Sequence, residues 1–315
     1  MTRGDDVVLR CRDLGAALAF YTHELGFRLD SIFPADDPRT AVLSGHGLRL
    51  RLQRGDGDRD AVAPTAPVTF AVGKLTADAR WVEGRAGMLY RDLLPDRQGG
   101  RLIASHIEIP VGGPVADYVH YHRVRFQLIY CHAGWVRVVY EDQGPPFVLR
   151  AGDCVLQPPQ IRHRVLECSD GLAVIEISSP AEHETHADHA LTLPTPVVRA
   201  NRSFDGQRFV RHRAEAATWQ SGPPGFASRD LGIAAATDDL AGARVLRPTT
   251  TAAALGEHRD LLRFWFVLRG GSSLTAAGSS YDLAAGDACV LPPRMRHAVD
   301  ACSADLELLE VSLRR

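Results

Sequence analysis

The 315-residue sequence lacks a strong bias in charge, because Lys and Arg total 36 and Asp and Glu total 38, a formal net charge of −2. Proteins that bind nucleic acids or anionic membranes normally carry a basic excess, so this balance argues against both partners. The sequence also lacks an apolar run of about 18 residues and an apolar signal segment after Met1. We therefore expect a soluble, cytoplasmic protein.

Paired cysteines are missing as well. The six cysteines stand far apart and none forms a C-x-x-C pair. Zinc knuckles and disulfide frameworks need paired spacings, so we expect reduced thiols that pack as small buried hydrophobes. The phosphate-binding, dinucleotide-binding and serine-hydrolase motifs are also absent, which leaves those functions without support.

What the sequence does contain is an internal repeat. Trp81–Leu93 recurs as Trp219–Leu231 at an offset of 138, with the Trp, both Gly, the Arg, the Asp and the Leu identical. Gly152–His163 recurs as Gly286–His297 at an offset of 134. Repeated segments that keep their order indicate a duplicated unit. We therefore expect two homologous domains, at residues 66–190 and 204–315.

Both repeats have the composition of strands. Short runs rich in β-branched and aromatic residues are separated by Gly, Pro and Asp about every ten residues, which is typical of a β-sandwich or barrel. The stretch Ala190–Arg199, with two prolines, is expected to link the two domains. Strands are expected at 126–131, 135–140, 172–177, 264–268 and 306–312.

The first 60 residues follow a different pattern. Val7–Cys11 has the composition of a strand, and Asp13 is placed to cap a helix that continues through Tyr21. Further strands are expected at 41–43 and 48–52, so residues 1–60 are expected to form a small α+β module of the βαβββ type. Residues 56–66 are expected to be a flexible join.

The residues with chemical potential concentrate between Tyr118 and Gln127. Side chains alternate along a strand, so His120 and His122 share a face, about 6–7 Å apart. His163 follows a Pro-Pro turn and is a natural third ligand, and Gln127 offers a neutral oxygen if a local bulge turns it inward. Three imidazoles from two strands can hold a divalent metal and leave positions open for substrate. Tyr118 has the same parity and is our candidate for a catalytic hydroxyl.

These spacings resemble the two motifs of the cupin family. Gly113-x6-His120-x-His122-x4-Gln127-x6-Gly134 is similar to the first motif, and Gly152-x5-Pro158-x4-His163 is similar to the second. With the repeat, the chain resembles a bicupin, which implies a mainly β fold of two tandem double-stranded β-helix (jelly-roll) barrels after the α+β module.

The resemblance also implies one divalent transition metal, Fe, Ni, Mn or Zn, in the first barrel. Its ligands would be His120, His122 and His163, with Gln127 at the position of the family's Glu. Loss of that negative charge predicts a preference for an anionic or enolate-like substrate oxygen. In the second barrel Gly256 and Arg263 replace two ligands, so we expect that barrel to be metal-free, either a structural partner or an anion binder.

Two other segments carry weaker signals. Cys11–Phe27 resembles the opening of a glyoxalase/vicinal-oxygen-chelate module, of which only one is present. We expect it to be a docking or dimerisation element, which makes a homodimer one expected arrangement. The polar run Glu182–His189 is expected to be a tail leaving the first barrel.

The leading functional hypothesis is a metal-dependent oxidoreductase, a dioxygenase that cleaves a small chelating molecule such as an enol, a diketone or an aromatic hydroxyl compound. An isomerase or a lyase of the same family would use the same ligands. The rival class is a non-enzymatic binder or sensor of a small molecule.

Overall fold

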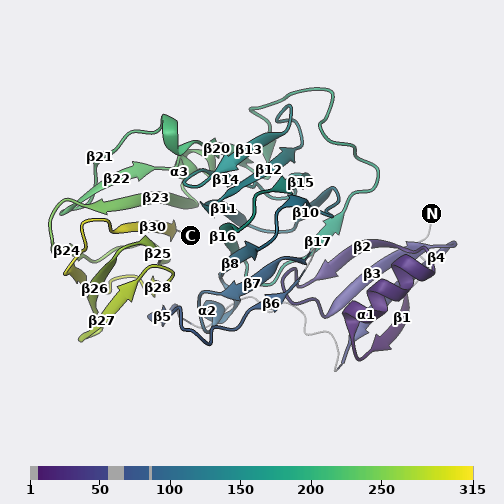
Figure 1. The fold of residues 1–315 in the computed structure, drawn as a ribbon, viewed down its shortest axis with the longest axis horizontal. Helices are drawn as coiled ribbons and strands as arrows, with labels where there is room; N and C mark the ends of the chain where they lie inside the picture. Colours follow the sequence, from purple (N-terminus) through teal and green to yellow (C-terminus); the bar gives the residue numbers. More distant parts are fainter. Residues whose placement is uncertain (1–5, 56–66, 85–86, 315) are drawn as a thin grey trace.

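The computed structural model describes residues 6–55, 67–84 and 87–314, so the join predicted at 56–66 lies outside the described residues. The described chain is mainly β, as predicted, and its three parts follow one another in Figure 1, from the purple N-terminal module through a teal barrel to a green and yellow barrel. No helix in these ranges has the length and apolar character needed to span a membrane.

The N-terminal module is a four-stranded sheet with one helix, in the predicted β-α-β-β-β order. Asp13 caps the helix, since its carboxylate accepts a hydrogen bond from the Ala16 amide at 2.9 Å. Strands lie in the order β1-β4-β3-β2, with β1 parallel to β4. The elements are β1 (Val7–Cys11), α1 (Leu14–Ala19), a π-helical turn (Phe20–Glu24), β2 (Arg28–Phe33), β3 (Thr40–Gly45) and β4 (Leu48–Arg54).

Each barrel contains one seven-stranded sheet, and the two sheets have matching strand orders. The first runs β20-β14-β11-β16-β8-β7-β6 and the second β5-β28-β25-β30-β23-β22-β21, so the sequence repeat is also a repeat of structure. The first sheet consists of β6 (Val82–Glu83), β7 (Leu89–Asp92), β8 (Ile103–Ile109), β11 (Phe126–Ala133), β14 (Cys154–Leu156), β16 (Leu172–Ser179) and β20 (Val210–His212). The second consists of β5 (Ala71–Gly73), β21 (Gln220–Ser221), β22 (Phe226–Asp230), β23 (Ala241–Pro248), β25 (Leu262–Arg269), β28 (Ala288–Leu291) and β30 (Glu307–Leu313).

A smaller sheet closes each barrel. In the second barrel it has the order β24-β29-β26-β27; in the first, β10-β15-β12-β13 is extended by β17 into β2 of the N-terminal module. These strands are β9 (Gly113–Pro114), β10 (His120–His122), β12 (Trp135–Tyr140), β13 (Phe147–Arg150), β15 (His163–Cys168), β17 (Thr185–Ala187), β24 (Ala253–Gly256), β26 (Gly271–Ala276), β27 (Ser279–Ala284) and β29 (His297–Asp300). The remaining elements are α2 (Arg97–Gly100), β18 (Ser203–Phe204), β19 (Gln207–Arg208), a 3-10 turn (Ala214–Ala216) and α3 (Ile233–Ala236).

The two barrels exchange strands. β5 precedes the first barrel but pairs with β28 of the second, and β20 precedes the second barrel but pairs with β14 of the first. Each exchanged segment is held by the Asp of the repeated Gly-Asp turn: Asp153 accepts from the Ala214 amide at 2.8 Å, and Asp287 from the Leu75 amide at 2.7 Å. The expected ranges 66–190 and 204–315 therefore misplace these two strands, because hydrogen bonding assigns each to the other barrel.

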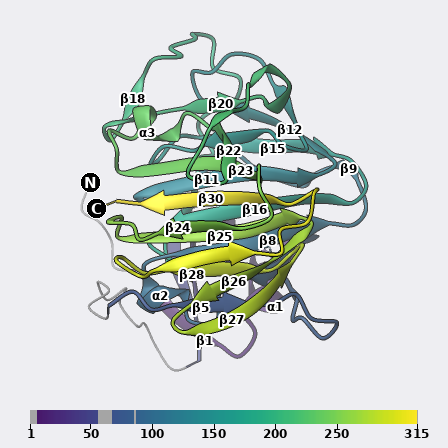
Figure 2. The same ribbon diagram turned by 90° about the vertical axis from the view of Figure 1, so that its left-hand side faces the viewer.

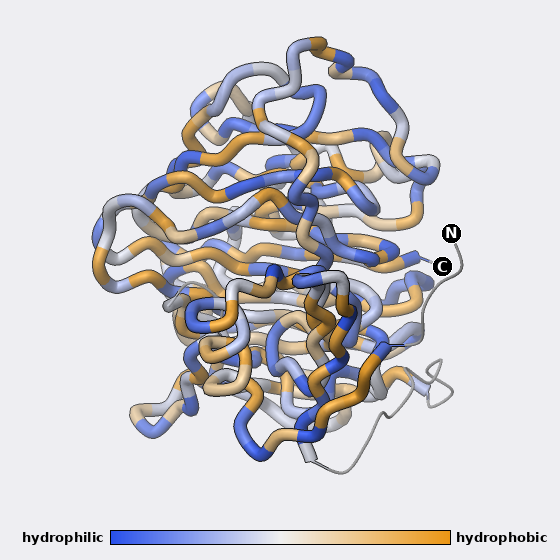
Figure 3. Tube along the Cα trace, turned by 90° about the vertical axis from the view of Figure 1, so that its right-hand side faces the viewer, coloured by the Kyte–Doolittle hydropathy of each residue, from blue (hydrophilic) through white to orange (hydrophobic). Residues whose placement is uncertain are grey.

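The strands of the two seven-stranded sheets overlap in the view of Figure 2, and one apolar core contains residues of both sheets. Strand β25 shows how both of its faces are used. Phe264 and Phe266 pack into the core between the barrels, whereas Trp265 and Val267 pack inside the second barrel. A strand buried on both faces has a continuous apolar sequence, and elsewhere apolar and polar segments alternate along many strands (Figure 3). The six cysteines are free thiols, as expected, and four of them are buried.

Candidate metal centre

Three histidines converge inside the first barrel. His120 on β10 lies directly opposite His163 on β15 in the antiparallel ladder, and their ring centroids are 4.2 Å apart. The ring of His122 lies 5.2 Å from the first and 5.3 Å from the second. One nitrogen of each ring lies within 4.8 Å of the others. The structure thus brings together the three side chains that the sequence analysis singled out.

Backbone carbonyls fix the orientation of two of these rings. Nδ1 of His120 lies 2.8 Å from the carbonyl oxygen of Tyr118, and Nδ1 of His163 lies 3.0 Å from that of Ile161. A carbonyl only accepts, so each Nδ1 carries the proton and Nε2 carries the lone pair that a metal needs. The buried carboxylate of Asp117 lies 3.5 Å from Nδ1 of His120 and reinforces this arrangement. The donor set therefore fits a divalent transition metal.

His122 is positioned by the segment that we expected to be a polar tail. Residues 185–187 instead form β17, which pairs with β10 and sets Thr185 opposite His122. The buried Thr185 hydroxyl lies 2.9 Å from Nδ1 of His122. The tail prediction was wrong because the strands on both sides of this short segment, rather than its composition, determine its structure.

Gln127 reaches the same cavity without the predicted bulge. The chain leaves β10 after His122 and re-enters a sheet at Phe126, so the strand alternation restarts there. Gln127 is buried, and its amide nitrogen donates to Oε1 of Glu176 at 2.8 Å. A carboxylate thus stands beside the neutral amide. We expected a preference for an anionic substrate oxygen because the neutral Gln127 stands at the position of the family's Glu. That expectation loses its basis, because Glu176 on β16 supplies a negative charge beside Gln127.

The sequence analysis missed Glu176 as a site residue. It shares an inward face of β16 with Leu172 and Val174, and its Oε1 also accepts from the Ser178 hydroxyl at 3.0 Å. The sequence did contain a signal for it. Glu176 is an acidic residue in the otherwise apolar run 172–177, and strand alternation puts it on the same face as Leu172 and Val174.

A fourth histidine lies against the cluster of His120, His122 and His163. His183 is buried, and its ring packs edge-on against His122 with centroids 5.4 Å apart. Its Nδ1 lies 3.2 Å from the Pro180 carbonyl, and its Nε2 has no hydrogen-bond partner among the described residues. Burial lowers the pKa of His183, opposed by the nearby carboxylate of Glu176. Because the ring of His183 is neutral and its Nδ1 donates to a carbonyl, its Nε2 carries a lone pair that can accept a hydrogen bond.

These side chains line a cavity of about 110 Å³. Its walls are mainly apolar and come from alternate residues of β8, β11, β12 and β16. Among the described residues that line it there is no Lys and no Arg. The polar lining consists of Asp36, Tyr90, Ser105, His120, His122, Gln127, Tyr140, Gln157, His163, Glu176, His183 and Thr185.

Tyr118, predicted as a pocket hydroxyl, is not among the described residues that line the cavity. It is half-buried, and its ring stands edge-on to His120 at 5.7 Å. The strand alternation that we used to place Tyr118 inward does not apply to it, because Tyr118 precedes the first residue of β10. Tyr140 lines the cavity instead and stacks on His163 at 5.4 Å. Burial raises the pKa of Tyr140, so its phenol stays neutral.

Comparisons with known proteins agree with this architecture. The Cupin domain family matches residues 105–178, and the Glyoxalase/Bleomycin resistance protein/Dioxygenase superfamily matches residues 4–101. No curated protein matches. Oxalate decarboxylase from Bacillus subtilis at pH 4.6 superposes with a TM-score of 0.56 at 13% identity, over 81% of this chain and 78% of that chain. The formate complex of Lactobacillus farciminis oxalate decarboxylase gives 0.57 at 14%, over 79% and 87%. The chain has the bicupin fold.

A further similar structure comes from work on the Mn(II) centres of the Bacillus subtilis enzyme, with a TM-score of 0.56 at 14% identity over 81% and 80% of the two chains. At these identities the likeness to solved structures concerns the fold alone. Within this bicupin, the glyoxalase-type match extends beyond the βαβββ module. Residues 67–101, as far as they are described, contribute β5, β6, β7 and α2 to the two barrels.

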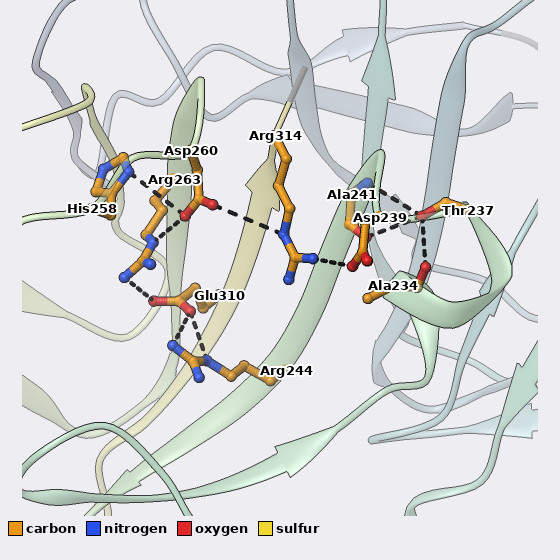
Figure 4. Close-up of polar contacts among 10 residues, drawn as sticks. All are labelled: Ala234, Thr237, Asp239, Ala241, Arg244, His258, Asp260, Arg263, Glu310 and Arg314. Carbon is orange, nitrogen blue, oxygen red and sulfur yellow. Dashed lines mark hydrogen bonds and ion pairs between the residues drawn. The ribbon is translucent and has the colours of Figure 1, made fainter.

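The second barrel of this bicupin has a guanidinium where the first has Gln127. Nε of Arg263 donates to Asp260 at 2.7 Å, and Nη1 lies 3.8 Å from Glu310 (Figure 4). Glu310 also accepts from Arg244 at 2.7 Å. The nearby His258 directs Nε2 to the Leu291 carbonyl at 3.0 Å. Arg263 is thus already paired with carboxylates of the protein, which weakens the expectation that it binds an anion.

Proposed function

We propose that this bicupin is a mononuclear metal-dependent dioxygenase that acts on a small, neutral, chelating substrate in its first barrel. The observation that carries the proposal is the set of three convergent imidazoles, two of them with Nδ1 tied to backbone carbonyls. His120, His122 and His163 would hold the metal, with the amide oxygen of Gln127 as a further candidate ligand.

A divalent Fe, Ni, Mn or Zn ion bound there would lower the pKa of a coordinated enol or hydroxyl, and a redox-active ion would engage dioxygen. Both atoms of dioxygen enter the product as a carbon–carbon bond breaks, so no external reductant is required. The protein's own groups handle the proton. Oε1 of Glu176 is occupied by Gln127 and Ser178, which leaves Oε2 to accept the substrate's hydroxyl proton. Apolar side chains form most of the wall around the reacting centre.

The polarity of the cavity supports a neutral substrate that donates hydrogen bonds. Glu176 and Nε2 of His183 are acceptors, and the described lining residues include no cation. A dianion such as oxalate would enter this cavity without a protein counter-charge, at a substantial desolvation cost. An enol or an aromatic hydroxyl compound loses only one proton and places apolar atoms against the isoleucine and valine walls.

A decarboxylating lyase is the second candidate, and the likeness in fold to oxalate decarboxylases favours it. A binder or sensor without turnover is the third. All three share the metal centre and differ in what they do to a ligand.

Elemental analysis of the purified full-length chain and of His122→Ala tests the metal centre. We expect about one transition-metal ion per chain in the wild type and a loss of it in the variant. Oxygen uptake is then measured with diketones, catechols and flavonols, and carbon dioxide release with oxalate. Release of carbon dioxide from oxalate without turnover of the other compounds would favour the lyase, and bound metal without turnover of any would favour the binder.

A further inference from the structure

The N-terminal module shares a sheet with the metal centre. β17 pairs with β2 of the module on one side and with β10 on the other. Thr185 lies opposite Ile32 in the first ladder and opposite His122 in the second. In the second barrel the equivalent of β10 is β24, and it is the last strand of its sheet within the described part of the chain. The extension therefore belongs to the barrel that contains the three histidines.

Polar contacts outside the sheet fix the module against the barrel. Arg97 on α2 donates to Asp36 at 2.6 Å, and Arg39 pairs with Glu182 at 2.9 Å. Nε2 of His189 lies 2.7 Å from the Leu29 carbonyl. The first two contacts hold the loop between β2 and β3 against α2 and against the segment that leads into β17, and the third joins β2 to the segment that follows β17.

That loop contributes to the cavity wall. Ala35 and Asp36 line the cavity, and its other described lining residues lie between Met88 and Thr185. The Asp36 side chain is only 13% exposed, whereas that of the neighbouring Asp37 is 53% exposed and pairs with Arg54. Of two adjacent aspartates, one faces the cavity and the other faces solvent.

From this geometry we infer that the N-terminal module is a working part of the first-barrel site, and that Asp36 determines specificity by disfavouring anionic ligands. The inference rests on the proposed metal centre and adds the selection of charge. Asp36 and Glu176 are the formally charged acidic groups of the described lining, which contains no Lys or Arg. Arg97, which is not among the lining residues, pairs with Asp36 and reduces its effect without removing it. A carboxylate in a confined, partly desolvated wall repels a second negative charge more strongly than one on the open surface.

The test uses the full-length chain loaded with Co²⁺, whose absorption bands report ligands that enter its coordination sphere. Azide serves as the anionic probe and imidazole as the neutral probe. We expect Asp36→Asn to tighten azide binding about threefold to tenfold and to leave imidazole binding unchanged. Asp37→Asn is the matched control, since it removes the same charge one residue away, and its azide affinity should equal that of the wild type.

A second variant gives the opposite change. Arg97→Gln leaves the carboxylate of Asp36 without its cation, so azide should bind more weakly than in the wild type. Equal azide affinities in Asp36→Asn and Asp37→Asn would overturn the inference while leaving the metal centre intact. Equal tightening of azide and imidazole would also overturn it, because that result means a looser loop rather than a charge effect. A wild-type chain that binds no Co²⁺ would instead remove the metal centre, and the inference with it.

Discussion

Thr185 offers the sharpest test of how the metal centre is held. Its hydroxyl lies 2.9 Å from Nδ1 of His122 and comes from a strand 63 residues further along the chain. Replacement by the isosteric Val keeps the side-chain volume but leaves Nδ1 buried beside a methyl group. Loss of such a supporting hydrogen bond typically costs 10- to 100-fold in metal affinity, or about 1.4–2.7 kcal/mol.

The assay is competition for Zn²⁺ between the protein and a chelating dye, together with urea unfolding of the metal-free chain. Thr185→Ser should recover most of the affinity because it restores the hydroxyl. Thr237→Val is the control, since the Thr237 hydroxyl is also buried and bonds the Ile233 carbonyl at 3.0 Å, but in the other barrel. It should lower the free energy of unfolding by about 1–3 kcal/mol without changing metal affinity. Wild-type affinity in Thr185→Val, or a Ser variant no better than the Val variant, would refute the reasoning.

Two further predictions concern buried polar groups. Gln127→Glu places a second carboxylate at the 2.8 Å contact with Glu176, so we expect the metal-free chain to lose about 1–3 kcal/mol of stability and added Zn²⁺ to restore it; an unchanged melting temperature without metal would count against that contact. Burial, with help from Arg91, lowers the pKa of His106 to about 3, below its ordinary value of 6.5. The unfolded chain therefore binds the extra proton, and this contribution to stability is present above pH 6.5 and is lost towards pH 3, with a slope of about 1.4 kcal/mol per pH unit. Urea unfolding at several pH values should show a flatter dependence in His106→Asn, and an unaltered slope would mean that His106 is not buried in neutral form.

Much of the architecture could be predicted because the signals are local. The Gly-Asp turns at 152 and 286 recur in sequence since each must hold an exchanged strand, and strict alternation placed His120 and His122 on one face. The strand exchange itself could not be predicted. β5 and β20 have three residues each, too few for a periodic pattern, and their pairing depends on distant sheet edges.

The same difference between local signals and long-range contacts explains which site residues could be predicted. The three histidines lie in motifs with fixed spacing, whereas Asp36, Glu176, His183 and Thr185 reach the cavity from three other segments of the chain. Their roles follow from contacts rather than from composition. Thr185 and His183 lie in the polar run 182–189, which is placed beside the cavity by the pairing of β17 with β10 and β2.

The exchange of β5 and β20 also bears on how such a chain arises. Each repeat takes its outermost strand from the segment in front of the other repeat, so neither is complete by itself. A protein containing only one repeat, with its leading segment, would need a second molecule to supply the missing strand. The present chain is thus organised as a strand-swapped dimer whose two subunits a single polypeptide has joined, and the connecting segment keeps each half at high effective concentration near its counterpart.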